Sequence, residues 1–511
     1  MYCTVQFIFI KEVKMNIYKQ NNLLFKYLRT IITLCTLGII FVGCSLLPTN
    51  EVLSKTNNLE KYKTKKTFEV KNNILWPKYD WWKIYNDPQL NELIEEALSD
   101  SPNIISAQAR LNQADAFTQV TKSSNLPQIS ANAEIMEEKY SYNYLTPASS
   151  TPQSWNDYGL GTLNFSWEID FWGKNHASIA ASISKVEAMK AELAQTRLTL
   201  SSAIASNYAQ IIRLFLDRDE LEEYLTVQNK LLTLLTQRFE NGLENKATIK
   251  NAKSVISKTE SEILSLDEQI SLERNKIAAL LGVGPDRGLK ITRPTIDFYK
   301  NEFGLPKEIA VNLIGRRPDI IASRMQVESQ KYLIDEKEAE FYPNINLSAF
   351  IGFQSLGLNL LTNKDSYIGS VGPAISLPLF TAGRLQGQLR SNISKYEEAV
   401  ANYNQTISQA LKEVADAGAS QKSLTNQLLK SEEAFSSSKE AYELKMKRYK
   451  GGLSNYLEVL YAQENLINVK RNLINQKSRA LTLDIALKYA LGGGYNEKLP
   501  IIKEGNDNGR K

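Results

Sequence analysis

The chain has 511 residues, with a hydrophobic fraction of 43%, a charged fraction of 23% and a formal net charge of +5, which are ordinary values for a folded protein. The basic residues are spread along the chain, which argues against a nucleic-acid-binding protein, because such proteins concentrate basic side chains on one face. The single histidine excludes a histidine-rich metal site, and no metal or other cofactor is expected.

Residues 1–43 are predicted to be a signal peptide that is removed from the mature protein. A basic region precedes a short apolar segment at 31–43, and Met15 is an alternative start that gives a more usual signal length. The apolar segment ends in Phe41-Val42-Gly43-Cys44, which resembles the bacterial lipobox, with Phe41 in place of the usual Leu. We therefore expect Cys44 to carry lipid; the alternative is a plain N-terminal membrane anchor.

The mature chain is predicted to begin with a lipidated, extended tether over 44–75, which is polar and rich in Lys and Asn. Asp after the lipidated cysteine retains well-studied lipoproteins at the inner membrane, so Ser45 favours the outer membrane. Cys3 and Cys35 lie in the removed segment, which leaves no thiol for a disulfide or for catalysis. No run of about 18 apolar residues follows the tether, so no transmembrane helix is expected.

The fold is predicted to begin near Trp76 with two short helices. Asp87-Pro88 and Pro102 each start one, since Pro is favoured in the first turn of a helix. Apolar and polar residues then alternate with period two over 128–138 and 158–170, which predicts two strands. At about ten residues each, such strands are long enough to cross a membrane when tilted.

The longest predicted element is a helix over 174–241, which contains no Gly or Pro and repeats apolar residues at helical spacing. It would form a rod of roughly 100 Å. Gly242 ends it, and a second run without Gly or Pro follows at 243–281. The charged residues at Asp217–Glu223 are interpreted as a solvated helix face, and His176 as a surface residue in the first helical turn.

The order of elements then recurs, which divides the chain into repeat 1 (76–290), repeat 2 (291–494) and a polar tail (495–511). Repeat 2 has strands predicted at 343–354 and 366–379. The matching positions are Pro102-Asn103 with Pro318-Asp319, Leu126-Pro127 with Tyr342-Pro343, Gly173-Lys174 with Gly383-Arg384, Gly242-Leu243 with Gly452-Leu453, and Leu281-Gly282 with Leu491-Gly492.

The long helix of repeat 2, at 384–450, contains Gly387 and Gly418 and is predicted to be the more breakable one. The helix lengths also predict how the helices stack. The runs 243–281 and 318–341 together are about as long as the rod of repeat 1, and 453–491 with 102–125 give the same sum. Each long helix is therefore expected to lie beside two shorter helices stacked end to end in these pairs.

Four strands cannot close a barrel, since about eight is the smallest number in membrane barrels. An open sheet edge in lipid would leave backbone groups without hydrogen bonds. One face of the strands carries Leu, Phe, Trp and Ile, and the other carries polar residues that suit a water-filled lumen. Other copies of the chain are therefore expected to complete the sheet. The alternative is a four-stranded amphipathic sheet on a soluble coiled coil.

Five motifs occur in order along these elements. They are Trp81-Trp82-Lys83-Ile84-Tyr85-Asn86-Asp87-Pro88-Gln89-Leu90, the strand exit Asp170-Phe171-Trp172-Gly173-Lys174, Arg316-Arg317-Pro318-Asp319, the strand exit Leu379-Phe380-Thr381-Ala382-Gly383-Arg384, and Arg448-Tyr449-Lys450-Gly451-Gly452-Leu453-Ser454-Asn455-Tyr456-Leu457-Glu458-Val459-Leu460. Together they resemble the TolC-like outer-membrane efflux proteins, in the lipoprotein branch often called NodT- or OprM-like. The resemblance implies a membrane α+β fold: a homotrimer with a 12-stranded barrel, and a long α-helical periplasmic barrel with an equatorial region.

The resemblance implies a passive exit duct for small toxic compounds in the bacterial outer membrane, lipid-anchored and reaching into the periplasm. Its implied partners are a periplasmic adaptor (membrane fusion protein) and an inner-membrane pump of the RND type, with no nucleic acid. Type I secretion and metal-ion efflux are alternative roles for such a duct. A non-pore structural coiled-coil lipoprotein is the alternative of another class. No nucleophile–base set and no paired carboxylates occur at a turn, so no enzyme activity is expected.

The family's hairpin tips are Arg-Phe/Tyr-x-x-Gly turns, which correspond here to Arg238 with Gly242 and Arg448 with Gly452. The resemblance implies that they dock the adaptor and pin a closed tip. The alternative is a purely structural role, because Gly permits the positive φ of a helix end and basic residues are favoured at helix C-termini.

The resemblance also places a periplasmic gate just past the tips. Glu458 is the acidic residue that three copies would arrange in a ring, whereas Thr248 replaces the acid in repeat 1 and Tyr461 stands where a second acid can occur. We hypothesise that Glu458 and Tyr461 line the closed aperture, and we expect weaker cation selectivity than an all-acidic ring would give.

Overall fold

The computed structural model describes residues 55–57, 61–64, 67–68, 74–143, 147–295, 306 and 309–495. The predicted signal peptide, the lipidation site at Cys44, parts of the tether and nearly all of the polar tail lie outside these residues. Among the described residues, no helix combines the length and apolar character that crossing a lipid bilayer requires.

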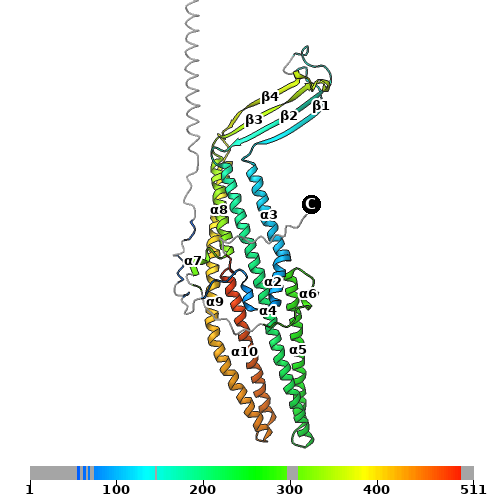
Figure 1. Ribbon diagram of the computed structural model, residues 1–511, viewed down its shortest axis with the longest axis vertical. Helices are drawn as coiled ribbons and strands as arrows, with labels where there is room; N and C mark the ends of the chain where they lie inside the picture. The colour runs from blue at the N-terminus through cyan, green and yellow to red at the C-terminus, as the bar shows by residue number, and fades with distance from the viewer. Residues whose placement is uncertain are drawn as a thin grey trace, which may run out of the picture. The chain divides into compact units, whose positions relative to one another are not determined.

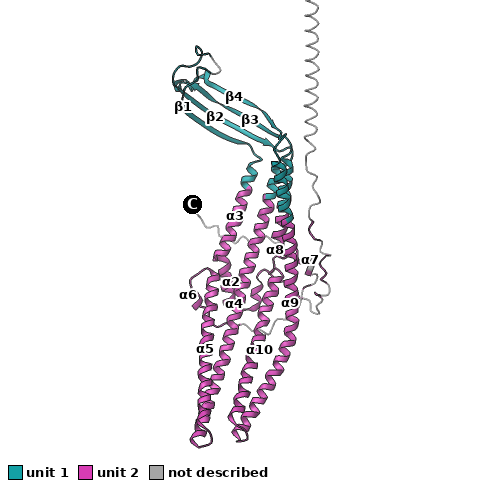
Figure 2. Cartoon of the chain, turned by 180° about the vertical axis from the view of Figure 1, so that it is seen from behind, with its two compact units in different colours: residues 1–54, 119–181, 330–397 teal, residues 55–118, 182–329, 398–511 magenta. Residues whose placement is uncertain are grey.

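The chain divides into two compact units, which Figure 2 shows in different colours. Among the described residues, the first unit holds Gln119–Ala181 and Gln330–Glu397. The second holds Lys55–Thr118, Ser182–Ser329 and the described part of Glu398–Lys511. Each unit draws on both predicted repeats, so the repeats are interleaved rather than folded as separate domains.

The first unit contains one antiparallel sheet of four strands in the order β1-β2-β3-β4 (Figure 1). Its register pairs Ile129 with Phe165 and Phe165 with Ala349, so residues from both repeats share one sheet face. Two single-turn 3₁₀ helices, η3 and η4, lie between the last two strands. The bounds are β1 Gln128–Glu138, β2 Asn156–Ile169, β3 Asn344–Leu356, η3 Leu358–Leu360, η4 Lys364–Ser366 and β4 Tyr367–Ser376.

The strands occur where the alternation of the sequence places them, with differences at the ends. β1 has the predicted bounds, β2 begins two residues earlier and β3 continues to Leu356. β4 ends at Ser376 rather than residue 379. Pro378 has no N–H to continue the ladder, and Leu377 before it is restricted in conformation, so the strand stops there although the alternation continues.

The helices of the chain include two of 67 residues each, α4 and α9, which form hairpins with α5 and α10 (Figure 1). α9 continues through Gly387 and Gly418, so neither glycine breaks the helix as the sequence suggested. The bounds are η2 Trp81–Tyr85, α2 Pro88–Asp100, α3 Pro102–Ser123, α4 Lys174–Glu240, α5 Lys246–Leu281, α6 Asp286–Leu289, α7 Ile309–Leu313, α8 Pro318–Ala339, α9 Arg384–Lys450 and α10 Tyr456–Ala490.

The short helices stack end to end, but with the partners exchanged relative to the prediction. The end of α5 meets the start of α3, since a Cβ on Gly282 would lie 2.1 Å from Cδ of Pro102. The end of α10 meets the segment before α8, since a Cβ on Gly492 would lie 2.0 Å from the carbonyl oxygen of Arg316. The lengths could not separate the two pairings, because α3 and α8 both have 22 residues.

An extra layer of η2 and α2 packs on the middle of α4 and on the C-terminal parts of α5 and α10, in an apolar cluster of the second unit. Asp87 caps α2, accepting a hydrogen bond from the N–H of Leu90 at 2.9 Å, as the Asp-Pro pair predicted. Its other oxygen accepts from the hydroxyl of buried Tyr208 on α4 at 2.9 Å. Burial raises the pKa of Tyr208, which therefore stays a neutral donor.

The segment Asp217–Glu223 is only in part a solvated face: Glu222 and Glu223 are exposed, whereas Asp217 is not, which corrects the sequence interpretation at that residue. Asp217 is 2% exposed and accepts a hydrogen bond from Nη1 of Arg213 at 2.8 Å, and burial raises its pKa. Lys470 of α10 pairs with Glu223 at 2.9 Å. The charges face a neighbouring helix, which sequence spacing alone does not reveal. By contrast, His176 lies on the surface as expected, with its ring near Asp170.

Candidate functional site

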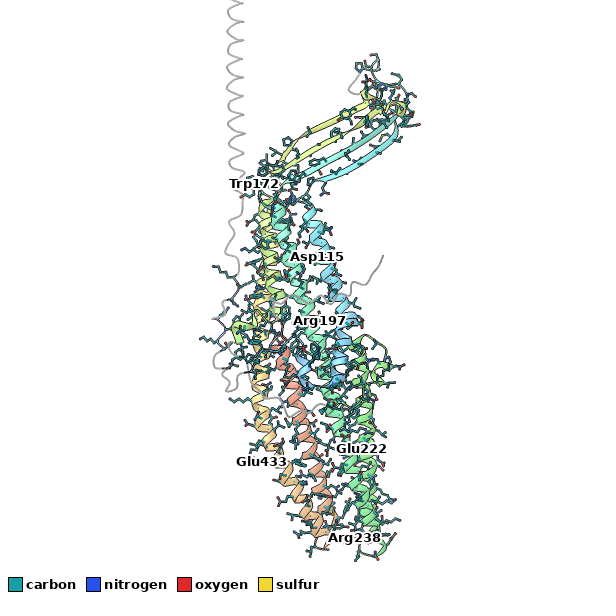
Figure 3. The ribbon with its side chains drawn as sticks, viewed as in Figure 1. Asp115, Trp172, Arg197, Glu222, Arg238 and Glu433 are labelled. Carbon is teal, nitrogen blue, oxygen red and sulfur yellow. The ribbon has the colours of Figure 1, made fainter. Side chains whose placement is uncertain are left out.

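The candidate site is the pair of hairpin tips, α4–α5 and α9–α10. At the first tip, Gly242 has φ +69, and the N–H of Leu243 donates to the carbonyl of Arg238 at 2.8 Å. Figure 3 labels Arg238 near this end of the hairpin. At the second tip, Gly452 has φ +75, and the N–H of Leu453 donates to the carbonyl of Arg448 at 2.9 Å. Both are glycine-terminated helix ends, in the turn geometry that needs a positive φ.

Each returning helix begins with an asparagine cap. Oδ1 of Asn245 accepts from the N–H of Thr248 at 3.0 Å, and Oδ1 of Asn455 accepts from the N–H of Glu458 at 3.1 Å. The tip glycines were predicted from the sequence and the caps were not, although Asn lies three residues past each tip glycine. The caps explain why α5 begins at Lys246 and not at residue 243.

The two tips contact each other through Tyr449. This side chain is 1% exposed, and its hydroxyl donates to Oε2 of Glu244 on the other hairpin at 3.0 Å. The guanidinium of Arg238 lies over its ring at 4.8 Å from the centroid. Burial and the bond to Glu244 raise the pKa of Tyr449 to about 12, so the hydroxyl stays a donor at physiological pH. Predicted tip residue Arg238 thus takes part in a contact between hairpins.

An apolar cluster lies beneath this contact and joins the hairpins over the last helical turns. It includes Leu231 and Leu235 of α4, Ala252 of α5, and Tyr456 and Val459 of α10. Tyr456 packs against Tyr449 with ring centroids 6.3 Å apart. Its hydroxyl is buried and meets no hydrogen-bond partner among the residues that the structure describes. The cluster therefore stabilises the tip contact mainly through apolar packing.

The three predicted gate residues have different surroundings. Glu458 lies in the first turn of α10 and forms an ion pair with Lys445 of α9, a partner that the sequence analysis missed. The hydrogen bond and the charge of Lys445 lower the pKa of Glu458, and Arg448 adds to the effect. Tyr461 is 63% exposed. Thr248 is buried, and its hydroxyl donates to Oε1 of Glu244 at 3.0 Å, so it supports the tip contact.

No group of three or more His, Cys, Asp or Glu side chains within the described ranges is arranged to hold a metal ion.

The comparisons with known proteins agree with this architecture. The family model described as "Outer membrane efflux protein" matches residues 93–283 and 310–493, which is more than half of the chain. The chain is 28% identical over 467 residues to the multidrug resistance outer membrane protein MdtQ of Escherichia coli, covering 89% of this chain and 96% of that protein.

A second relative is the fusaric acid resistance protein FusA of Burkholderia cepacia, which is 33% identical over 322 residues, or 61% of this chain. The chain spans 59% of the length of that relative. Among solved structures, the outer membrane protein VceC of Vibrio cholerae is 43% identical, with a TM-score of 0.78 and coverage of 82% of this chain and 100% of that chain.

The Campylobacter jejuni CmeC outer membrane channel has the same fold, with a TM-score of 0.79 over 89% of this chain and 95% of that chain, at 22% identity. The matched segments include both helical hairpins and all four strands. The chain therefore belongs to the outer membrane efflux protein family and has the fold of its channels.

Proposed function

We propose that this chain is the exit duct of a tripartite efflux system, a homotrimer that crosses the outer membrane and extends into the periplasm. The observation that carries the proposal is the open four-stranded sheet. β1 and β4 each have one edge without a strand partner among the described residues. In lipid those backbone groups need partners, and pairing β4 of one copy with β1 of the next supplies them. Three copies then give twelve strands, as the resemblance implies.

The apolar side chains of the edge strands support a membrane location. Ile129 and Ile135 of β1 and Val371 and Ile375 of β4 are all at least 68% exposed in the single chain. They alternate with Ser130, Asn132 and Ser370, as expected when one face meets lipid and the other meets water.

The trimer is tested by gel electrophoresis of the purified full-length protein without and with heating. A folded barrel migrates as a trimer before heating and as a monomer of about 58 kDa or less afterwards. A chain that migrates as a monomer under both conditions would support the non-pore structural lipoprotein instead.

Within this duct, Glu458 and Tyr461 line the closed periplasmic aperture, and the tips at Arg238, Gly242, Arg448 and Gly452 dock a periplasmic adaptor. The exposed side chains of Glu458 and Tyr461 near the tips support the first role. Thr248 contributes indirectly, by holding Glu244. The chain then acts as a passive duct without catalytic activity, and an inner-membrane pump of the RND type supplies the energy.

Small toxic compounds are the proposed cargo, because the relatives are named for resistance to many drugs and to fusaric acid. Type I secretion and metal-ion efflux remain alternatives, since a wide pore does not select its cargo. Chemical crosslinking at the tips in intact cells, followed by identification of the crosslinked adaptor and pump, tests this assignment. Recovery of a secretion ATPase in place of an RND-type pump would overturn it.

We also propose that Cys44 is lipidated and that the tether after it docks on α9. The N–H of Asn57 donates to Oδ1 of Asn404 at 2.9 Å, and the hydroxyl of Tyr62 donates to the carbonyl of Asn404 at 3.3 Å. Twelve residues separate Cys44 from Asn57, an extended reach of roughly 45 Å. Asn404 lies about 30 Å along α9 from Arg384, where the strands give way to the helix. Mass spectrometry of the mature N-terminus tests the lipidation.

A further inference from the structure

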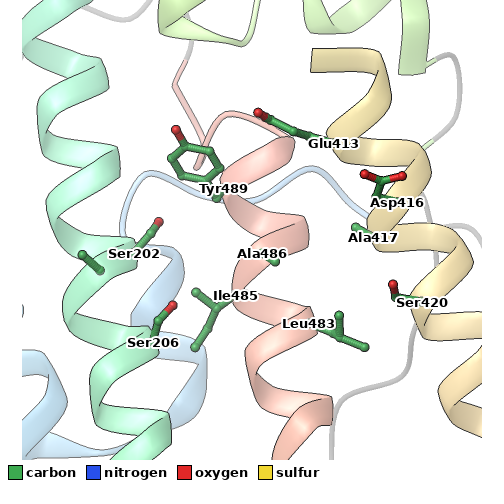
Figure 4. Close-up of a pocket in the computed structure, with 11 residues that line it drawn as sticks. Ser202, Ser206, Glu413, Asp416, Ala417, Ser420, Leu483, Ile485, Ala486 and Tyr489 are labelled. Atoms are coloured by element: carbon green, nitrogen blue, oxygen red, sulfur yellow. The ribbon is translucent and has the colours of Figure 1, made fainter. Parts of the chain in front are cut away.

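A hollow of about 440 Å³ lies in the second unit between α4, α9 and α10, away from the tips (Figure 4). Its floor is apolar, with Leu483 and Ala486 of α10. Its walls carry hydroxyl groups from Ser202 and Ser206 of α4 and from Ser420 of α9. The volume falls in the range of pockets that hold small molecules. The combination of an apolar floor and a polar rim suits an amphipathic ligand.

The charge of the hollow has one sign. Glu413 and Asp416 line it, and its lining, as far as the structure describes the chain, includes no Lys or Arg. Glu413 is occupied, since Nη1 of buried Arg317 donates to it at 2.7 Å. Asp416 is 63% exposed and meets only the equally exposed Lys412 among the described residues, at 2.8 Å on the same helix. Such a surface pair is weak, so Asp416 remains available to a cationic ligand.

A buried hydroxyl group points to a missing ligand or water. Ser202 is 8% exposed, yet its Oγ has no hydrogen-bond partner in the part of the chain that the structure describes. Figure 4 shows it at the wall of the hollow, beside Tyr489. Tyr489 is held there, because Nε2 of Gln195 donates to its hydroxyl at 3.1 Å. A buried hydroxyl without a partner is costly, and a ligand in the hollow would satisfy it.

The hollow lies on the face of the helices that the η2–α2 layer leaves open. On α10, Asp484 and Lys488 contact Tyr85 of that layer, whereas Leu483 and Ala486 occupy another face; Ile485 lies between the two faces and belongs to both the layer's cluster and the hollow. On α4, Tyr208 binds the layer, whereas Ser202 and Ser206 share a different face. In a ring of helices with this layer outside, the open face is the one that lines the tunnel.

From this geometry we infer that the hollow is a transient binding site for amphipathic organic cations on the tunnel wall. The inference rests on the proposed duct and specifies the class of cargo. Asp416 supplies the charge, the floor of α10 takes the apolar part of the ligand, and Ser202 accepts or donates a hydrogen bond. Binding must be weak for a duct to release its cargo, so a dissociation constant in the millimolar to high micromolar range is expected.

The test uses ethidium, a planar organic cation, and the purified full-length protein in detergent, with fluorescence anisotropy as the readout. Asp416→Asn should weaken binding roughly three- to fivefold, because it removes the free carboxylate. Lys412→Gln should strengthen binding, because it frees Asp416 from its pair. Glu433→Gln is the matched control: Glu433 forms a similar exposed pair with Lys430 on α9, away from the hollow, and its loss should change nothing.

Ser206→Phe blocks the hollow from an exposed position and should also weaken ethidium binding. The neutral aromatic probe N-phenyl-1-naphthylamine should respond to Ser206→Phe but not to Asp416→Asn. Equal ethidium affinity in wild type, Asp416→Asn and Ser206→Phe would overturn the site. Loss of the trimer in Ser206→Phe would overturn it too, because it would show that a neighbouring copy covers the hollow. Ion conductance, measured on the same samples, reports on the duct independently of ethidium.

Discussion

At the scale of single residues, the tip contact gives different surroundings to two tyrosines that the sequence does not distinguish. Tyr449 and Tyr456 are both buried and both belong to the second tip. Among the described residues, only Tyr449 of the two has a hydrogen-bond partner for its hydroxyl, Glu244 on the opposite hairpin. The position of Tyr449 beside Glu244 depends on how the hairpins pack, which no local pattern encodes. The two residues therefore offer a matched pair of substitutions.

Tyr449→Phe should weaken the association of the hairpins by about 1 kcal/mol, because it leaves Oε2 of Glu244 without the Tyr449 donor. Single-channel recordings should then show more frequent opening than in wild type. Tyr456→Phe removes a hydroxyl that has no partner among the described residues, so it should be neutral or slightly stabilising. Equal opening of the two variants would contradict a specific role for the Tyr449–Glu244 bond.

Lys445 compensates the charge of Glu458, so the proposed acidic ring should select cations only weakly. Lys445→Gln should expose the carboxylates and shift the reversal potential in a KCl gradient toward that of potassium. Lys430→Gln removes an exposed lysine from a similar pair on the same helix and serves as the control. An unchanged reversal potential in Lys445→Gln would place Glu458 away from the narrowest point of the pore.

The pH dependence of this pair follows from the lowered pKa of Glu458. Because the folded chain stabilises the charged carboxylate, the ion pair contributes fully above the usual pKa of 4.5, and its contribution is lost below 4.5, as the pH falls through the lowered pKa of Glu458. Conductance of the wild type should therefore change on acidification through this range. Glu458→Gln should show no such change, since it has no group to titrate there.

At the scale of elements, the sequence predicts what each segment forms better than which segments meet. The period of two located β1 to β4, and the runs without Gly or Pro located α4 and α5, because these signals are local. The stacking partners were wrong, since α3 and α8 have equal lengths and length was the only criterion. The ion pairs of Glu223 with Lys470 and of Glu458 with Lys445 were missed for a related reason: each partner lies on a different helix.

The junctions between stacked helices should be sensitive to a single methyl group. Gly492 has φ +86, and a Cβ would collide with the backbone of Arg316, so Gly492→Ala should destabilise the fold by at least about 2 kcal/mol. Gly387 lies in α9 with open space around it, so Gly387→Ala should stabilise by about 0.5–1 kcal/mol. Thermal unfolding followed by circular dichroism measures both. A lower midpoint for Gly387→Ala than for Gly492→Ala would contradict the stacking.

At the scale of the whole molecule, the sheet depends on contacts between copies and the hairpin tips on contacts within one chain. In the proposed trimer the two edges of the sheet pair with other copies, whereas the hairpins end in tips that contact each other within one chain. A channel that opens must separate the tips while the trimer stays assembled. The second hairpin contains Gly387 and Gly418, and glycine lowers the stability of a helix, so we expect this hairpin to move.

Engineered disulfides between residues 450–460 of neighbouring copies should therefore abolish export and restore it on reduction. The mature chain has no native cysteine besides the predicted lipidated Cys44, so the engineered disulfides form without competition from native thiols. Undiminished export by the oxidised, fully crosslinked trimer would show that the second hairpin need not move.

The central claim is that three copies enclose a water-filled pore, and ion conductance tests it most directly. Full-length protein purified as a heat-sensitive trimer and added to a planar lipid bilayer should give discrete conductance steps of uniform size. In Tyr449→Phe the steps should be larger, or the channel should be open more often, than in wild type. A trimer that inserts but never conducts, in wild type and in the tip variant alike, would contradict the account.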